Sequence, residues 1–328
     1  QALYPATADD NPHRAENAID LTNLALQVTL TEGASISPDP SKVMDYSQTR
    51  KFTVTSQDGN WHKEYSVIID TFDLPFQYDF EHYELNETGK YQVFFEETQG
   101  TALFKQYIWA SGNSGFALTG VGRNPQEYPT VSIENGIDGS RAIKLETKST
   151  GQFGETVKMP IAAGNLFLGS FDVNNAVQKP LKATLFGLPF GKKPLKFKGY
   201  YKYVPGTQSF KAKDKNGNTV TISRQEDEGD IYAVLYEAAG LDGKVLDGNN
   251  VLTSKNIVAL ARVEVEKTDR YIEFETSFQY GERKEISWPQ FIYRDPSDDG
   301  TGKYLRFSEE KMKNYEYNLA VVFTSSKY

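Results

Sequence analysis

The stretch PLKFKGYYKYV, residues 194–204, carries the pattern that decides the fold of this 328-residue chain. Successive side chains of a β-strand point to opposite faces of a sheet, so a strand with one buried face alternates apolar and polar residues. The alternation predicts a buried face made of Leu195, Phe197, Gly199, Tyr201 and Tyr203. It predicts an exposed face made of Lys196, Lys198, Tyr200 and Lys202. Most aromatic side chains of the stretch are therefore expected to pack, and Tyr200 is expected to be exposed.

Runs of the same kind recur along the chain, with turn clusters such as KDKNGN (213–218) between them. The predicted strands are 24–30, 51–56, 63–70, 90–97, 141–148, 165–172, 194–204, 218–223, 229–238, 256–265, 270–280 and 317–326. A helix is predicted over 308–316, where Ser308 precedes two acidic residues. Alternating strand–helix units are absent from the pattern, and many short strands are typical of a sandwich or jelly roll. The predicted fold class is all-β.

Composition excludes several classes of protein. The chain has no cysteine, which excludes disulfides, zinc–thiolate sites and cysteine nucleophiles. Its formal net charge is −8, and an acidic chain lacks the basic surface of a nucleic-acid binder. No apolar run approaches the roughly 18 residues that a membrane-spanning helix needs. The polar start of the sequence shows no signal peptide.

The strand pattern divides the chain into two expected domains. Residues 1–72 hold about three strands, two of them joined as a hairpin by the Asp-Gly turn of QDGN (57–60). Three strands do not close a sandwich. This part is therefore predicted to be either a fragment of an immunoglobulin-like β domain or a small sheet that packs on its neighbour. Residues 73–328 hold the remaining strands and are predicted to form a β-sandwich or jelly roll.

Several long runs in residues 73–328 resemble the putative carbohydrate metabolism domain family, which occurs in exported lipoproteins of Gram-negative gut anaerobes. The runs are WASGNSGFALTG (109–120), AIKLETKSTGQFG (142–154), MPIAAGNLFLGSFD (159–172), KPLKATLFGLPFGKKPLKFKGYYKYVPG (179–206), DIYAVLYEA (230–238) and LTSKNIVALA (252–261). Residues 20–69 resemble the small Ig-like module that often precedes this domain. The resemblance implies a jelly roll, a place in the cell envelope or on the cell surface with a lipid anchor upstream, and a connection with glycans. It implies no catalytic residues.

Three side chains are the candidate ligand contacts. In WASGNSGF (109–116), Trp109 offers a stacking face and Asn113 an amide donor and acceptor, in a segment expected to be a loop. Loops on a rigid scaffold often carry binding residues. The alternative is that Trp109 fills one end of the sandwich core. Tyr200, between lysines on an exposed strand face, is the third candidate.

No motif requires a cofactor, although two acidic positions are compatible with structural calcium. In DPSDDG (295–300), Asp295 and Asp299 fall at positions 1 and 5 of a calcium loop, but position 12 is Arg306 where a bidentate glutamate is needed. Carbohydrate-binding jelly rolls often hold calcium between an acid after the first strand and an acid in the last strand. Glu81 lies where the first acid would be. The alternatives are a solvated acidic turn and an ordinary edge-strand glutamate.

Three functions remain open at this point. The first is a glycan-binding or glycan-associated surface protein without catalysis. The second is a glycoside hydrolase, which needs two carboxyl groups about 5–9.5 Å apart. Its candidates are Glu81, Glu96, Glu97, Glu146, Asp172, Asp230 and Glu237. The third is a structural or adhesive subunit with a protein partner. A shallow aromatic platform would favour the first function, a carboxylate pair in a cleft the second, and a large apolar patch the third.

Overall fold

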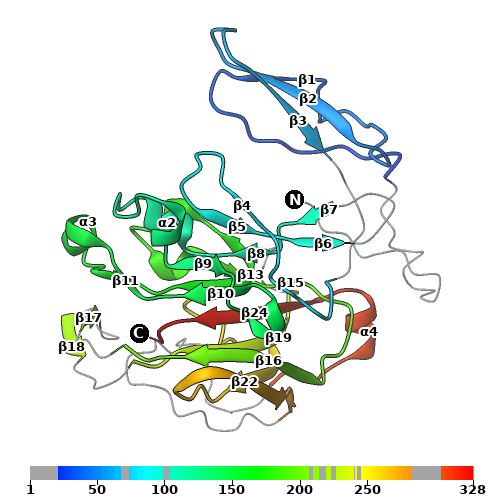
Figure 1. Cartoon of the computed structure of the whole chain (residues 1–328). Helices are drawn as coiled ribbons and strands as arrows, with labels where there is room; N and C mark the ends of the chain where they lie inside the picture. The colour runs from blue at the N-terminus through cyan, green and yellow to red at the C-terminus, as the bar shows by residue number, and fades with distance from the viewer. Residues whose placement is uncertain are drawn as a thin grey trace. The chain divides into compact units, whose positions relative to one another are not determined.

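The computed structural model has two compact units, with the boundary between Leu74 and Pro75. It describes residues 21–67, 74–98, 104–206, 210–213, 219–222, 227–239, 241, 245–281 and 304–327. Each unit has a hydrophobic core of its own. Within these residues the structure is mostly antiparallel β-sheet with short helices, so the predicted all-β fold class is confirmed (Figure 1).

The first unit contains a three-stranded antiparallel sheet in the order β1-β2-β3. The strands are β1 (Ser35–Ser37), β2 (Arg50–Thr55) and β3 (His62–Val67). The predicted hairpin of β2 and β3 is confirmed. In the turn between β2 and β3, the Asp58 carboxylate accepts hydrogen bonds from the Ser56 hydroxyl and the Asn60 backbone N–H. Gly59 has a φ of +72°, a conformation that favours glycine.

The core of the first unit is built around Tyr46 and Phe52, whose stacked rings have centroids 6.3 Å apart. The strand predicted over 24–30 is wrong, because Leu24 makes only an isolated bridge to Met44. Leu24 nevertheless packs against this core. Alternating leucines therefore indicate that one side of an extended segment is buried. They do not show that the segment is hydrogen-bonded into a sheet.

The second unit is organised around a nine-stranded antiparallel sheet. Seven strands follow the order β20-β14-β13-β24-β19-β21-β23, and in addition β8 pairs with β13 and β15 pairs with β24. Its strands are β8 (Trp109–Ala110), β13 (Asn165–Phe171), β14 (Thr184–Phe186), β15 (Leu188–Pro189), β19 (Asp230–Glu237), β20 (Leu246–Asp247), β21 (Ile257–Val263), β23 (Gln279–Tyr280) and β24 (Tyr317–Thr324). Strand β24, red in Figure 1, lies between β13 and β19 and so joins the end of the chain to its middle.

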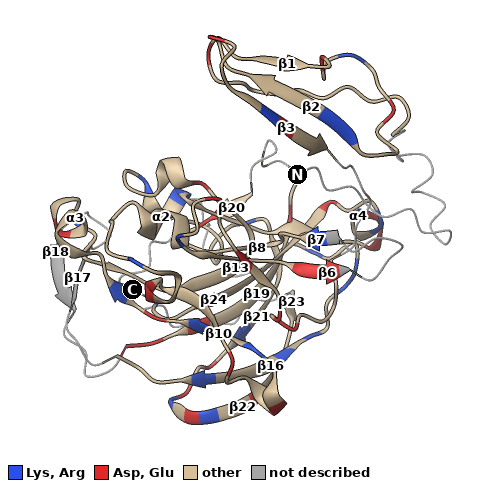
Figure 2. Ribbon diagram, turned by 45° about the horizontal axis from the view of Figure 1, so that its top comes forward, with Lys and Arg blue, Asp and Glu red and all other residues tan. Residues whose placement is uncertain are grey.

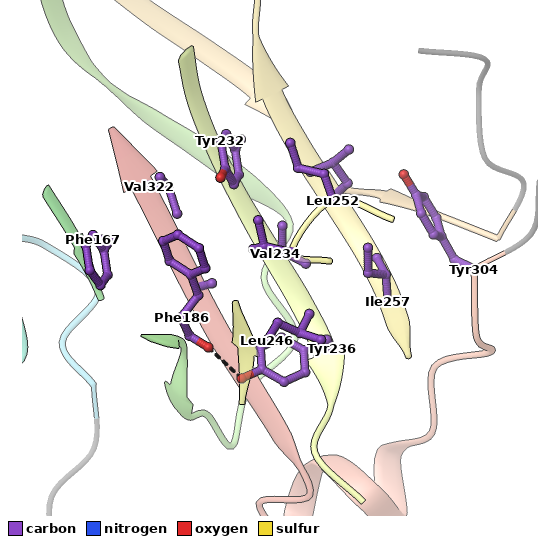
Figure 3. Close-up of a cluster of buried hydrophobic side chains, with 13 residues drawn as sticks. Phe167, Phe186, Tyr232, Val234, Tyr236, Leu246, Leu252, Ile257, Tyr304 and Val322 are labelled. Atoms are coloured by element: carbon purple, nitrogen blue, oxygen red, sulfur yellow. Dashed lines mark hydrogen bonds between the residues drawn. The ribbon is translucent and has the colours of Figure 1, made fainter. Parts of the chain in front are cut away.

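Both faces of the central strands are covered. On one face of the sheet, every second residue of β19 and β24 belongs to a buried hydrophobic cluster, which Figure 3 shows. The members from these two strands are Tyr232, Val234, Tyr236, Ala320 and Val322, and the members from other segments are Phe167, Phe186, Leu246, Val251, Leu252, Ile257, Leu260 and Tyr304. The hydroxyl of Tyr236 donates to the Phe186 carbonyl at 2.6 Å, so this buried polar group is paired. On the opposite face, Phe323 contacts the rings of Phe197 and Trp109.

Six two-stranded sheets complete the described β-structure of the second unit. They are β4 (Tyr83–Leu85) with β5 (Gln92–Phe94), β6 (Glu96–Thr98) with β7 (Phe104–Gln106), β9 (Thr130–Ile133) with β10 (Ala142–Leu145), β11 (Lys148–Ser149) with β12 (Ile161–Ala162), β16 (Lys196–Tyr203) with β22 (Thr268–Ser277), and β17 (Phe210–Lys213) with β18 (Thr219–Ile222).

The described helices are short. They are α2 (Asn113–Ala117), α3 (Gly151–Thr156), α4 (Glu309–Lys313) and the 3-10 helices η1 (Pro125–Glu127), η2 (Ile137–Gly139), η3 (Val173–Asn175) and η4 (Pro180–Lys182). The helix predicted over 308–316 is confirmed as α4, where the Ser308 hydroxyl accepts a hydrogen bond from the Lys311 backbone. Helices α2 and α3 were not predicted, because five or six residues are too few to show a helical period.

Strand β16 shows the predicted alternation. Its four polar-face residues are exposed: Lys196, Lys198, Tyr200 and Lys202. Phe197, Tyr201 and Tyr203 point inward but are half-buried. The prediction for Leu195 is wrong, because this side chain is 68% exposed. It lies before the strand begins, beyond the aromatic contacts that Phe274 and Phe323 make with Phe197.

Candidate functional site

Trp109 lies in the core of the second unit. The predicted loop is wrong here, because Trp109 belongs to β8 and pairs with Leu168 of β13. Its side chain is only 4% exposed. The ring centroid lies 5.0 Å from that of Tyr78 and 5.2 Å from that of Phe80. These neighbours cover the ring, so it has no free face for a ligand, and the alternative that Trp109 fills the core agrees with the structure.

Asn113 is fully buried as the first residue of α2. Its amide nitrogen donates to the Thr130 carbonyl at 2.8 Å, and its amide oxygen accepts from the Thr130 backbone N–H at 3.2 Å. These bonds join α2 to β9. The donor and acceptor that were expected to meet a ligand are thus used inside the protein.

A buried carboxyl group lies beside Trp109. The indole N–H donates to Glu96 Oε1 at 2.7 Å, and Glu96 is 6% exposed. Burial disfavours the charged carboxylate and raises the pKa of Glu96 to about 7, with a further contribution from the negative charge of Asp79. The hydrogen bond from Trp109 acts in the opposite direction. Two nearby buried groups have no hydrogen-bond partner among the described residues, the Tyr78 hydroxyl and the Gln106 amide oxygen.

The buried carboxyl predicts that stability depends on pH. The pKa of Glu96 is raised from 4.5 to about 7 in the folded protein, so the folded state holds this proton more tightly. The stabilisation is fully present below about pH 4.5 and is lost as pH rises through about 7. We expect Glu96→Gln, which stays neutral, to raise the free energy of unfolding by about 1–3 kcal/mol near pH 8 and to flatten the pH profile.

Thermal unfolding between about pH 5 and pH 8 measures this effect. Glu97→Gln is the matched control, because Glu97 is the next residue and its side chain is 34% exposed. The control should keep the wild-type pH profile. Equal profiles for wild type and Glu96→Gln would show that Glu96 does not hold its proton in the folded state.

The third candidate, Tyr200, is on an open face. Its side chain is 57% exposed, between Lys198 and Lys202 on β16. Across the sheet it is paired with Glu273 of β22, and Lys198 is paired with Glu275. Figure 2 shows basic residues on β16 and both basic and acidic residues on β22. We call the exposed side of Lys196–Lys202 and Glu273–Glu275 the β16–β22 face.

A second polar and aromatic cluster was not predicted. It consists of Glu84 on β4, Lys105 on β7 and Tyr107 just after β7. The Tyr107 hydroxyl donates to Glu84 at 2.6 Å, and Lys105 forms an ion pair with the same carboxylate at 2.5 Å. These bonds lower the pKa of Glu84, whereas burial and the adjacent carboxylate raise the pKa of Tyr107 to about 12. The only signal in the sequence is the alternation of Lys105 and Tyr107 with the buried residues Gln106 and Ile108.

The described residues contain no group of three or more potential metal ligands. The Glu81 carboxylate accepts the Arg141 backbone N–H at 2.7 Å, which is an ordinary structural contact. Asp295 and Asp299 lie outside the described residues. The calcium predictions for Glu81 and for that loop both stay predictions.

The chain belongs to a carbohydrate-related family. The model of the putative carbohydrate metabolism domain matches residues 79–328, and the model named SGBP, N-terminal, matches residues 14–69. The chain therefore belongs to the putative carbohydrate metabolism domain family, as the resemblance in the sequence indicated. The N-terminal match indicates a domain like that of surface glycan-binding proteins.

Two solved structures are similar. A protein from Bacteroides thetaiotaomicron VPI-5482, described as a putative glycoside hydrolase, is 40% identical, with a TM-score of 0.74 over 94% of this chain and 81% of that chain. A protein from Bacteroides vulgatus ATCC 8482 with the same description is 33% identical, with a TM-score of 0.59 over 76% of this chain and 88% of that chain. A search of curated proteins gave no significant match.

Among the described residues, no helix has both the length and the apolar character that crossing a membrane requires.

Proposed function

We propose that this protein binds a polysaccharide or glycan without cleaving it, and that the β16–β22 face is the contact surface. The observation that carries the proposal is the exposure of Tyr200, a large aromatic ring that is 57% exposed among charged side chains. The carbohydrate-related family supports the class of ligand.

The chemistry of the face suits a sugar. An aromatic ring covers the apolar C–H face of a pyranose, and neighbouring polar groups meet its hydroxyls. Lys198 and Lys202 supply donors, while Glu273 supplies an acceptor. A flat strand face offers few contacts, so affinity for one sugar segment is expected to be weak. Display of many copies on a surface would compensate through multivalency.

Placement on a cell surface belongs to the same proposal. A domain like that of surface glycan-binding proteins precedes the larger domain, which supports an exported protein of the cell envelope. A lipid anchor upstream would hold it there. Its partner is then a glycan outside the cell, and a protein partner is compatible with the same placement.

Glycoside hydrolysis is the second candidate function. It is favoured by the description of both similar structures as putative glycoside hydrolases. The raised pKa of Glu96 is also a property of a general acid. Against this, Glu96 is 6% exposed and bonded to Trp109, whereas a general acid has to reach the glycosidic oxygen. We therefore place hydrolysis second.

Calorimetry against a panel of plant and host polysaccharides tests the proposal. We expect Tyr200→Ala to weaken binding about tenfold, equivalent to about 1.4 kcal/mol, because a stacking ring is lost. The same substitution should change the free energy of unfolding by less than about 1 kcal/mol, since the side chain is exposed. Tyr65→Ala is the matched control, because Tyr65 is an exposed tyrosine of the first unit with Lys63 beside its ring.

Three results would contradict the proposal. Unchanged affinity for Tyr200→Ala would place the contact surface elsewhere. New reducing ends in the incubations, abolished by Glu96→Gln, would establish the hydrolase instead. If neither binding nor cleavage occurs with any polysaccharide of the panel, the structural or adhesive function takes first place.

A further inference from the structure

Phe76 is the most exposed of the large hydrophobic side chains that the structure describes, at 74%. The Lys192 ammonium lies over its ring, 4.1 Å from the centroid. Phe190, itself buried, meets the same ring at 84° with centroids 6.5 Å apart. The ring is thus held by two neighbours while most of its surface stays open to solvent.

A second lysine beside Lys192 is held in the same way. The Lys193 ammonium lies 5.1 Å from the ring centroid of Tyr280 and 4.7 Å from that of Phe307. These two rings pack edge to face, and the Tyr280 hydroxyl donates to the Pro194 carbonyl at 2.7 Å. A cation held over aromatic rings keeps its position while its N–H donors remain available.

Among the described residues, no carboxylate forms an ion pair with Lys192 or Lys193. Other lysines of this unit do have such partners, including Lys196 with Glu275 and Lys311 with Glu237. Lys192 and Lys193 thus place two neighbouring positive charges, without an acidic partner among the described residues, on a chain with a net charge of −8.

We propose that Phe76, Lys192 and Lys193 form a subsite for an acidic sugar residue, one that carries a carboxylate or a sulfate. The proposal rests on the proposed function for its ligand class, a glycan, and it adds the charge of that glycan and a second contact surface. The aromatic ring takes the C–H face of the sugar, and the two ammonium groups take its anion.

Charge separates this subsite from the β16–β22 face. There, Glu273 and Glu275 lie across from Tyr200 and Lys198 and would repel an anion. At the subsite the two positive charges have no acidic partner among the residues that the structure describes, so an anion would gain attraction from both. Exposed charges are screened by salt, and binding at the subsite should therefore weaken as ionic strength rises.

The test uses the full chain, with polygalacturonate as carboxylate probe, dextran sulfate as sulfate probe and dextran as neutral probe. We expect Lys192→Gln/Lys193→Gln to weaken binding of an acidic probe at least about tenfold at low salt, with no change for dextran. Phe76→Ala should weaken it about fivefold. The two acidic probes distinguish the carboxylate from the sulfate.

The matched control is Lys179→Gln/Lys182→Gln, which removes the same two charges from exposed lysines of the same unit. This control should bind as wild type. If both double variants lose the same affinity for the acidic probes, overall charge alone attracts the glycan and the proposal is overturned. Failure of the wild-type protein to bind either acidic probe would also overturn it. If Phe76→Ala leaves binding intact but increases proteolysis between the two units, Phe76 is a contact for the first unit and the subsite is wrong.

The outcome for Tyr200→Ala separates this inference from the proposed function. Loss of acidic binding in Lys192→Gln/Lys193→Gln alone would support the subsite and contradict the role of Tyr200. Loss of neutral-glycan binding in Tyr200→Ala alone would leave the β16–β22 face in place and contradict the subsite.

Discussion

Arg262→Ala should lower the free energy of unfolding by about 3–5 kcal/mol. In the folded protein, Arg262 donates from Nε to Asp230 Oδ1 at 2.9 Å and from Nη2 to Asp230 Oδ2 at 2.6 Å. The two side chains are only 14% and 5% exposed. Removal of the guanidinium leaves the Asp230 carboxylate buried between neighbouring strands without its counter-charge, and an unpaired buried charge is costly. Chemical denaturation near pH 7 measures the loss.

Two further variants define the cause. Lys144→Ala breaks the ion pair of Lys144 with Glu146, which has a similar length of 3.0 Å but side chains 46% and 48% exposed. It should cost less than about 1 kcal/mol. The double variant Asp230→Leu/Arg262→Met should recover most of the stability, because it removes both charges at once. If Arg262→Ala costs no more than Lys144→Ala, the buried pair does not stabilise the sheet.

Trp109→Ala should also lower the free energy of unfolding by about 3–5 kcal/mol, because a large buried ring is removed from the core. Tyr78, Phe80 and Phe323 would lose their common neighbour, and Glu96 would lose its indole N–H donor. Glycan affinity of the protein that remains folded should not change, since the ring has no exposed face. Thermal unfolding and calorimetry on the same preparation measure the two effects.

Trp109→Phe keeps an aromatic ring in the core. It removes the N–H donor to Glu96 and leaves a smaller cavity than Trp109→Ala, so it should cost less. A tenfold loss of glycan affinity in folded Trp109→Ala or Trp109→Phe would return Trp109 to the binding surface and contradict its assignment to the core.

The stretch 194–204 shows how far sequence patterns reach. Its alternation predicted which residues of β16 point outward, and Tyr200 is exposed as expected. The same alternation did not predict how deeply the inward residues are buried. Leu195 falls on the apolar face by its place in the alternation, but its side chain is exposed. How deeply a side chain is buried depends on which other segments cover the strand, and not on the strand itself.

The candidate site was harder to predict for the same reason. Trp109 stands in a run of small residues that is typical of a loop, yet its neighbours Phe80 and Phe323 come from distant parts of the sequence. The pairs of Lys192 with Phe76 and of Lys193 with Phe307 also join distant segments. Patterns of two to four residues carry no information on such contacts.

The sequence alone determined the all-β class, the position of most strands, the outward face of β16 and the carbohydrate-related family. These follow from local backbone geometry, in which every second side chain shares a face, and from long specific runs of residues. Only the tertiary structure decided that Trp109 and Asn113 are internal, that Glu96 is a buried carboxyl and that Lys192 and Lys193 lie over aromatic rings. Burial and charge pairing depend on residues that the fold brings together from far apart in the chain, and local periodicity does not encode which residues these are.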